Sequence, residues 1–258
     1  MVITDDIVEY VQALELAPPK ASPTKAGGRL MVSADEVEPD PDKVHVTLTG
    51  GAVLINQPGM STQSIADVAN SCTFAQRAAD KKFPDLKGDM SKWFDEYLNV
   101  LKKIGWFYKE VNYQDFDISS KDFTMDQVVL SIAAAIYTGG GSLIVEATLK
   151  AVGAMADESG KLHAFKSESQ SENQAKFQIA DARETNGSVK MKMANLNLHS
   201  KQSSGTVLFF FDWKLNDASA SYSELDLSLN ASVYSKVRKI ILDKLVDKTV
   251  SNVLDIDV

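Results

Sequence analysis

The stretch 175-AKFQIADARETNGSVKMKM-193 alternates apolar and polar residues on both sides of Asn186-Gly187. A period of two residues indicates a β-strand that turns one face toward a core. The Asn-Gly pair favours the type I′ turn of a two-residue hairpin. This stretch therefore predicts two antiparallel strands joined by a tight turn.

The apolar pattern continues toward the C-terminus with two changes of phase. It moves by one residue between Met193 and Leu196, which predicts a β-bulge near Ala194-Asn195. Val207–Phe211 is apolar at every position and predicts a central strand, and Tyr222–Leu229 predicts a further strand with a second change of phase. Asn230 is then expected to cap a closing helix that continues for a turn or two as far as Leu254.

Toward the N-terminus the period changes to that of helices. Ser61 or Ser64 is expected to cap a helix that ends near Lys82, and Asp89 a helix over Met90–Ile104 that Gly105 terminates. Strands are expected at Val44–Thr49, half-buried and extending as far as Ile55, and from Trp106 to about Ile118. The apolar stripes of the two helices consist of Ile65, Val68, Ala69, Cys72, Ala75 and Ala79, and of Trp93, Phe94, Tyr97, Leu98, Leu101 and Ile104.

Residues 128–155 form an unusually apolar segment whose only charges are Glu146 and Lys150. A capping box at 124–127 predicts a helix over 124–138, Gly139–Gly141 interrupts it, and Ser142 begins a helix over 142–157. A helix that is apolar on nearly every face must be covered on nearly every face. A short strand over 162–166 is expected to follow.

The N-terminal 43 residues differ in composition from the rest of the chain. They hold nine acidic and four basic residues and five of the seven prolines. We expect a short helix over 1–16, capped by Thr4, and an extended arm over 17–43. Residues 44–258 are expected to form one domain, an α+β three-layer helix–sheet–helix sandwich whose largely antiparallel sheet is flanked by helix pairs.

Composition excludes several classes of protein. The 258 residues are 44% hydrophobic, which excludes general disorder, and a single cysteine excludes a disulfide-built scaffold. A net charge of −8 argues against nucleic acid as a partner. No apolar stretch reaches the length of a transmembrane helix. The acidic start lacks a signal-peptide pattern, so we expect synthesis in the cytoplasm, with any release by a signal-independent route.

Candidate reactive residues are scattered along the chain. His45, His163 and His199 fall in three different predicted strands, and Cys72 lies on an apolar stripe, where a thiol is typically a small buried side chain. Gly139–Ser142 lacks the lysine and the spacing of a phosphate-binding loop. We therefore expect no catalytic, cofactor-binding or metal-binding residue, no cofactor and no enzymatic activity.

The charged pairs have simpler interpretations. The pairs Asp115/Asp117 and Asp255/Asp257 stand at the ends of predicted elements, where carboxylates commonly serve as caps or contact water. Lys190 and Lys192, with Lys201, predict one basic strand face. Such a face is too small for nucleic acid and large enough to touch an anionic surface.

The order of the predicted elements resembles that of the cytolytic delta-endotoxin (Cyt-type) fold, which fungal volvatoxin-like proteins and the Erwinia virulence factor share. The resemblance is architectural, covers residues 44–258, and transfers no functional residue. It implies a non-enzymatic, membrane-perturbing protein that is made in a soluble form with a removable terminal arm.

Three classes of function remain open. The first is a pore-forming or membrane-perturbing toxin-like protein or virulence factor, with a lipid membrane as its partner. The second is a non-enzymatic binding or structural module, either a carrier of an apolar ligand or a homo-oligomeric assembly protein. The third is an enzyme with a noncontiguous site. The first is the leading hypothesis, because the order of the elements resembles the Cyt-type fold and residues 128–155 are nearly free of charge. The structural interpretation of that segment is a core helix pair that is buried because it covers the sheet, and it holds for the soluble form of a toxin as well.

Overall fold

The computed structural model describes most of the chain outside the segments near residues 19–41, 117–169, 201–217 and 247–250. The described residues are 2–18, 29–31, 42–49, 52–84, 90–116, 131, 134, 145–147, 170–171, 174–200, 218–246 and 251–255. The predicted strands over 162–166 and 207–211, the glycines 139–141, and the residues Asp117, His163, Lys201 and Asp257 lie outside them.

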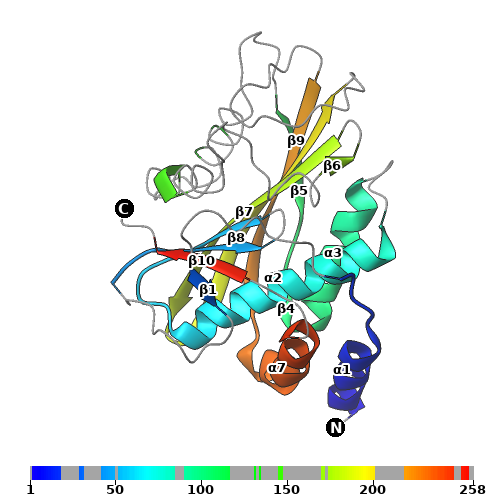
Figure 1. Ribbon diagram of the computed structural model, residues 1–258, viewed down its shortest axis with the longest axis vertical. Coiled ribbons are helices and arrows are strands. Elements are labelled where there is room, and N and C mark those ends of the chain that lie inside the picture. Colours follow the sequence, from blue (N-terminus) through cyan, green and yellow to red (C-terminus); the bar gives the residue numbers. More distant parts are fainter. Residues whose placement is uncertain are drawn as a thin grey trace.

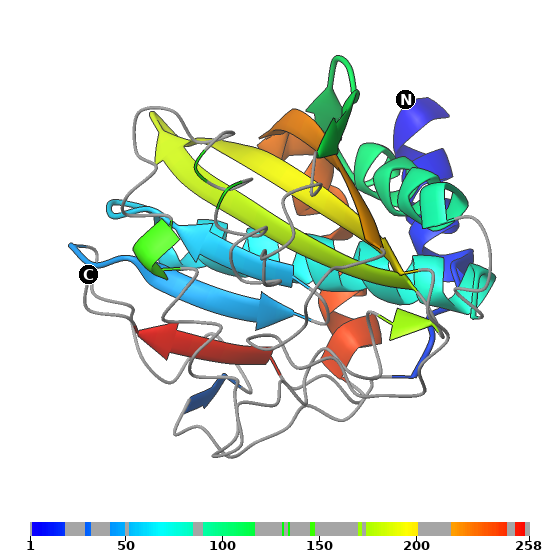
Figure 2. The same cartoon turned by 90° about the horizontal axis from the view of Figure 1, so that it is seen from above.

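A twisted, largely antiparallel sheet forms the centre of the molecule (Figures 1 and 2). Its strands are ordered β1-β10-β2-β3-β7-β8-β9-β4, with β5 also paired to β9 and β6 to β7. The bounds of the strands are β1 Arg29–Met31, β2 His45–Thr49, β3 Ala52–Asn56, β4 Trp106–Tyr108, β5 Asn112–Phe116, β6 Gln170–Ser171, β7 Gln174–Thr185, β8 Ser188–Ser200, β9 Ala218–Leu229 and β10 Ser251–Asp255.

The helices of the described residues that share one face of this sheet are α1 Val2–Ala13, α2 Thr62–Lys82, α3 Met90–Lys103 and α7 Ala231–Val246, and this face is called the helix face below (Figure 2). Helix α2 packs against α3, α7 and β2, and α1 packs on α7. The predicted short N-terminal helix is therefore present, but it begins at Val2, so Thr4 lies within the helix and is not its cap.

The main core lies between these helices and the sheet. All six residues of each predicted apolar stripe are buried, and they meet Ala180, Met191, Leu225 and Leu227 of the sheet. Ser61 caps α2, with its side chain accepting a hydrogen bond from the Ser64 amide. Local patterning thus predicted α2 and α3 to within a few residues.

Gly105 ends α3 where the chain passes close to the start of α7. Its φ is +111°, and an added Cβ would lie 3.1 Å from Val233 Cγ1 and 3.3 Å from the Asn230 carbonyl oxygen. The Asn230 amide donates to the Gly105 carbonyl, and the Asn230 side chain accepts from the Val233 amide, as expected of a helix cap. One glycine therefore permits both the helix end and the close approach.

A second layer occupies the opposite face, which is called the outer face below. The two views place the helical residues Val145–Ala147 on this side of the sheet, and Ala147 is fully buried (Figures 1 and 2). Ser131 and Ala134 are also helical. Apolar side chains of this face, such as Val53, Ile179 and Leu196, are fully buried as well. The three-layer α+β sandwich expected from the sequence is the architecture of the protein.

Several predicted strands are divided or replaced. The strand expected from Val44 toward Ile55 is a hairpin of β2 and β3, and it is buried on both faces because His45 and Thr47 are as inaccessible as Val46. The strand expected from Trp106 is divided into β4 and β5. The helical extension expected near Leu254 is wrong, since residues 251–255 form β10 between β1 and β2. Pairing with two neighbours outweighs the helical spacing there.

The predicted β-bulge near Ala194-Asn195 is also wrong. The pairing of β8 with β7 and β9 runs without interruption through both residues. The apolar phase moves because the sheet is covered on both faces here, with Met193 buried toward the helices and Leu196 toward the outer face. The change of phase at Tyr222 in β9 has the same cause.

Candidate functional site

The candidate reactive residues do not converge in the described part of the chain. His45 lies in β2 and His199 in β8, with β3 and β7 between them. No group of three or more His, Cys, Asp or Glu side chains among the described residues could hold a metal ion. Asp115 lies in β5, which pairs with β9, and Asp255 lies in β10, which is separated from β9 by β2, β3, β7 and β8.

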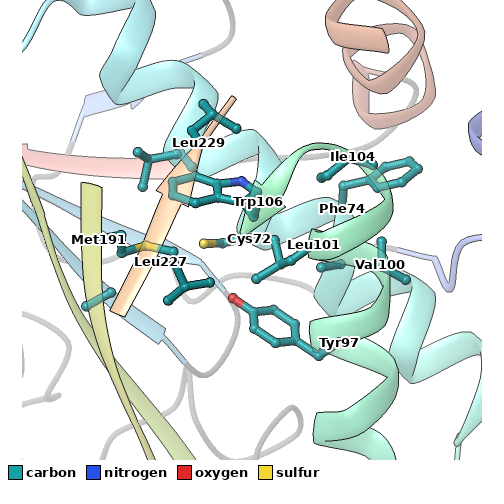
Figure 3. Packing of buried hydrophobic residues seen from close by; sticks show 14 of the residues in the cluster. Cys72, Phe74, Tyr97, Val100, Leu101, Ile104, Trp106, Met191, Leu227 and Leu229 are labelled. Atoms are coloured by element: carbon teal, nitrogen blue, oxygen red, sulfur yellow. The ribbon is translucent and has the colours of Figure 1, made fainter. Parts of the chain in front are cut away.

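Cys72 is fully buried between α2, α3 and the sheet, as predicted (Figure 3). It belongs to the same buried cluster as Trp106 and Met191, and the Tyr97 hydroxyl points toward it. Burial raises the pKa of the Cys72 thiol to about 12, although the nearby Tyr97 hydroxyl partly offsets this, and burial also raises the pKa of Tyr97. A thiol in this environment stays protonated at neutral pH and is a poor nucleophile.

The basic strand face expected from Lys190 and Lys192 is reduced at one of the two lysines. Lys192 forms an ion pair with Glu224 at 2.6 Å and stands in register with Asp181 on one side and Asp226 on the other. Lys190 stands in register with Arg183 of β7 and Ser228 of β9, so positive charges adjoin at this end of the strands. The acidic neighbours of Lys192 could not be predicted, because cross-strand partners cannot be read from one strand alone.

A partly buried ion pair joins α2 to α7. The Arg238 guanidinium donates to both carboxylate oxygens of Asp67, at 2.9 and 2.7 Å, and Gln63 donates to the same carboxylate at 3.0 Å. The hydrogen bond to Asp67 raises the pKa of Arg238 above its usual value. This is the bidentate geometry in which arginine–carboxylate pairs are strongest.

The far end of α2 meets β7 through another polar contact. Trp93 donates from its indole nitrogen to Asp80 at 2.8 Å, and Lys176 donates to the same carboxylate at 3.3 Å. The Lys176 ammonium lies 3.1 Å from the centroid of the Trp93 ring, in a cation–π arrangement. This lysine is 6% exposed, so its charge is balanced inside the protein.

Polar residues of β7 and of the chain between β3 and α2 meet on both faces of the sheet, and together they are called the seam cluster below. It consists of Gln57, Ser61, Asp181, Arg183 and Glu184. Glu184 accepts from the Ser61 amide at 2.9 Å and from the Ser61 hydroxyl at 3.0 Å. Asp181, which is fully buried, accepts from Gln57 at 2.6 Å and from Arg183 at 2.7 Å.

Glu184 in this cluster completes the N-terminus of α2. The first turn of α2 carries no acidic residue, so a carboxylate from β7 supplies the negative charge that a helix N-terminus favours. Burial opposes ionisation of Glu184, but the hydrogen bonds from Ser61 and Ser64 outweigh it and lower the pKa of this carboxyl. Asp181 and Glu184 were not predicted as functional residues, because in an alternating strand they resemble ordinary solvent-facing positions.

Helix α1 is attached to the same helical layer by apolar packing and by hydrogen bonds to carbonyl groups at its C-terminus. Lys244 of α7 donates to the carbonyls of Gln12 and Leu14, at 2.6 and 2.7 Å. Ala17 and Arg77 exchange two hydrogen bonds, at 2.9 and 2.8 Å. Val11 is fully buried in the main core. The last turn of α1 has no basic residue of its own, so Lys244 supplies the charge that this end favours.

Comparisons with known proteins give structural neighbours alone. No protein-family model matches the sequence, and no curated protein matches it. A solved structure described as a delta-endotoxin is 13% identical, with 83% of this chain and 90% of that chain covered and a TM-score of 0.39.

Two further solved structures are similar to the same degree. The activated Cyt2Ba monomer from Bacillus thuringiensis subsp. israelensis is 11% identical over 70% of this chain and 98% of that chain, with a TM-score of 0.37. The Evf virulence factor is 11% identical over 94% of this chain and 89% of that chain, with a TM-score of 0.36. The resemblance to Cyt-type toxins and to the virulence factor expected from the sequence is thus found, as a distant similarity of architecture.

Proposed function

We propose that this chain is a non-enzymatic, membrane-active protein of the toxin-like kind, which perturbs or permeabilises a lipid bilayer after release of its outer helical layer. The observation that carries the proposal is the segment 128–155, which has two charges in 28 residues. Its described residue Ala147 is fully buried on the outer face of the sheet. A segment of this composition is stable only while it is covered by protein or lipid.

Among the described residues, no helix is both long enough and apolar enough to cross a membrane. In the proposed mechanism the apolar segment leaves the outer face and enters the bilayer, and the helices of the other face remain with the sheet.

Ala134 offers a direct test, because it is helical and exposed within the apolar segment. A lysine there points into water in the resting protein and leaves folding intact, but it must be carried into hydrocarbon if the segment inserts. A lysine at the centre of a membrane-inserted helix costs about 3 kcal/mol. Ala134→Lys should therefore reduce dye leakage from phosphatidylcholine vesicles by about tenfold or more.

Asn99→Lys is the matched control, since it adds the same charge at an exposed position of α3, outside the segment. It should leave leakage unchanged. Equal leakage from Ala134→Lys and the unmodified chain would remove the segment from the mechanism. No leakage from any form, including protein cleaved between α1 and β2 by limited proteolysis, would overturn the membrane proposal and favour a binding or structural module.

A further inference from the structure

The sheet is built from two antiparallel blocks that meet at one parallel pair of strands. The first block is β1-β10-β2-β3, and the second is β6 and β7-β8-β9 with β4 and β5. Strands β3 and β7 are parallel, whereas every other described pair is antiparallel. The β3–β7 pair is called the seam below (Figure 2).

The seam is short compared with the pairing inside the second block. Its register contains five residue pairs, against twelve for β7–β8 and eleven for β8–β9. Parallel pairing is also slightly less stable per residue than antiparallel pairing. Backbone hydrogen bonds therefore hold the two blocks together less strongly than they hold the second block itself.

Polar side chains fasten this short seam on both faces of the sheet. The Gln57 amide extends the seam by donating to the Ala182 carbonyl at 2.9 Å. Beyond it, Gln57 binds Asp181, and Ser61 binds Glu184. Because Ala180 and Ala182 face the helices, Asp181 points to the outer face and Glu184 to the helix face.

Helix α2 follows β3 in the chain and crosses to the second block with further polar contacts. Gln76 donates to Gln178 at 3.1 Å, and Asp80 accepts from Lys176 at 3.3 Å. Polar side-chain contacts made by residues between Gln57 and Asp80 therefore contribute to holding the two blocks together. Polar contacts can exchange for water with little net loss of free energy, unlike buried apolar surface.

We propose that the β3–β7 seam is the joint at which the two blocks of the sheet separate, and that Glu184 holds it closed by binding the N-terminus of α2. The separation of the two blocks is proposed for the protein in solution, without a membrane. Its consequence at a membrane rests on the proposed function, because parting the blocks would uncover the outer face against which Ala147 is buried.

Amide hydrogen exchange of the full chain in solution tests the joint without a membrane. In Glu184→Gln, we expect exchange to accelerate by about fivefold or more in peptides covering β3 and the first turn of α2. Peptides within β8 and β9 should keep the rates of the unmodified protein. The matched control is Glu224→Gln, which removes a carboxylate that pairs with Lys192 inside the second block, and it should leave the β3 rates unchanged.

The outcomes separate the two proposals. Uniform acceleration across β3, β8 and β9, no acceleration at all, or the same β3 effect from Glu224→Gln would overturn the seam as the joint. If β3 responds selectively, Glu184→Gln should also speed vesicle leakage. A selective exchange effect without leakage from any form would keep the joint and refute the membrane function. If the protein causes leakage, but Glu184→Gln changes neither the leakage nor the exchange of β3 selectively, the joint is refuted and the membrane function is kept.

Discussion

Helices α2 and α3 lie side by side on the same face of the sheet, yet different chemistry holds them. Helix α3 turns one apolar stripe inward and leaves Lys92, Asn99, Lys102 and Lys103 exposed. Helix α2 also has an apolar stripe, but Asp67, Ser71, Thr73 and Gln76 are buried with it. Helix α3 is held mainly by burial of area, with two polar contacts to α2 through Trp93 and Glu96. Helix α2 is held also by polar partners in β7 and α7. Polar partners specify a position in the fold, whereas apolar area mainly supplies stability.

The largest effect is expected from the apolar helix. Phe94 is 1% exposed and stacks with Tyr97 at a centroid distance of 5.9 Å. Phe94→Ala should lower the free energy of unfolding by about 3–5 kcal/mol, because it removes buried area and leaves a cavity. Chemical denaturation measures this change. A loss below about 1 kcal/mol would show that α3 is not held by its stripe.

A smaller loss is expected when the polar anchor of α2 is removed. Asp67→Ala leaves the Arg238 side chain, 29% exposed, without its bidentate partner and should cost about 2 kcal/mol. The double variant Asp67→Ala/Arg238→Ala should lose less than the sum of the single variants. Asp243→Ala serves as the control, because its pair with Lys239 is exposed on both sides, and it should cost about 0.5 kcal/mol or less.

Cys72 is buried where α2 packs against α3, so replacing it tests that packing. Cys72→Ala should cost about 1–2 kcal/mol, since a small buried side chain is shortened, and should leave vesicle leakage unchanged. In the native protein the thiol should react with a labelling reagent only as fast as the protein opens. Rapid labelling without denaturant would contradict the packing of Cys72 beneath Tyr97.

The smallest effect is a dependence of stability on pH. The pKa of Glu184 is lower in the folded protein than in the unfolded chain, so its contribution is complete above the unfolded value, near pH 4.5, and is lost as the pH falls through the folded value. The groups that bind Glu184 are Ser61 and Ser64, whereas the nearby charged positions of β7 and β8, namely Asp181, Arg183, Lys190 and Lys192, alternate to the outer face of the sheet.

The stability difference between the unmodified protein and Glu184→Gln should therefore be constant between about pH 6 and 8 and disappear in acid. Urea titrations across this range measure it. A difference that grows as the pH falls would have the wrong sign and would refute the lowered pKa.

Much of the helix face could be predicted because its signals are local. Ser61, Gly105, Asn186 and Asn230 occupy the caps and turns that their residue types favour, and the apolar stripes have the helical period. The seam cluster could not be predicted in this way. Ser61 and Glu184 are 123 residues apart, and no local pattern tells which strand will supply a carboxylate to a helix. The one available signal was the absence of acidic residues from the first turn of α2.

The sheet was harder to predict for a different reason. Where both faces are covered, apolar residues no longer mark one side, so the change of phase at Ala194 indicated a bulge that does not exist. The strand β10 was mistaken for a helix because its partners, β1 and β2, come some two hundred residues earlier in the chain. In both cases long-range pairing determined the structure, and single-segment periodicity carried no information about it.

The completion of α1 and α2 by distant residues also sets the order in which a growing chain can fold. The Gln12 carbonyl can accept its hydrogen bond only after Lys244, 232 residues later, has been synthesised, and the Ser61 amide likewise requires Glu184. During synthesis the apolar segment 128–155 leaves the ribosome before the strands β7, β8 and β9 exist. Contacts of such long sequence separation form slowly. We therefore expect nascent chains that stop before residue 174 to engage chaperones strongly, and those that extend beyond residue 246 to be released from them.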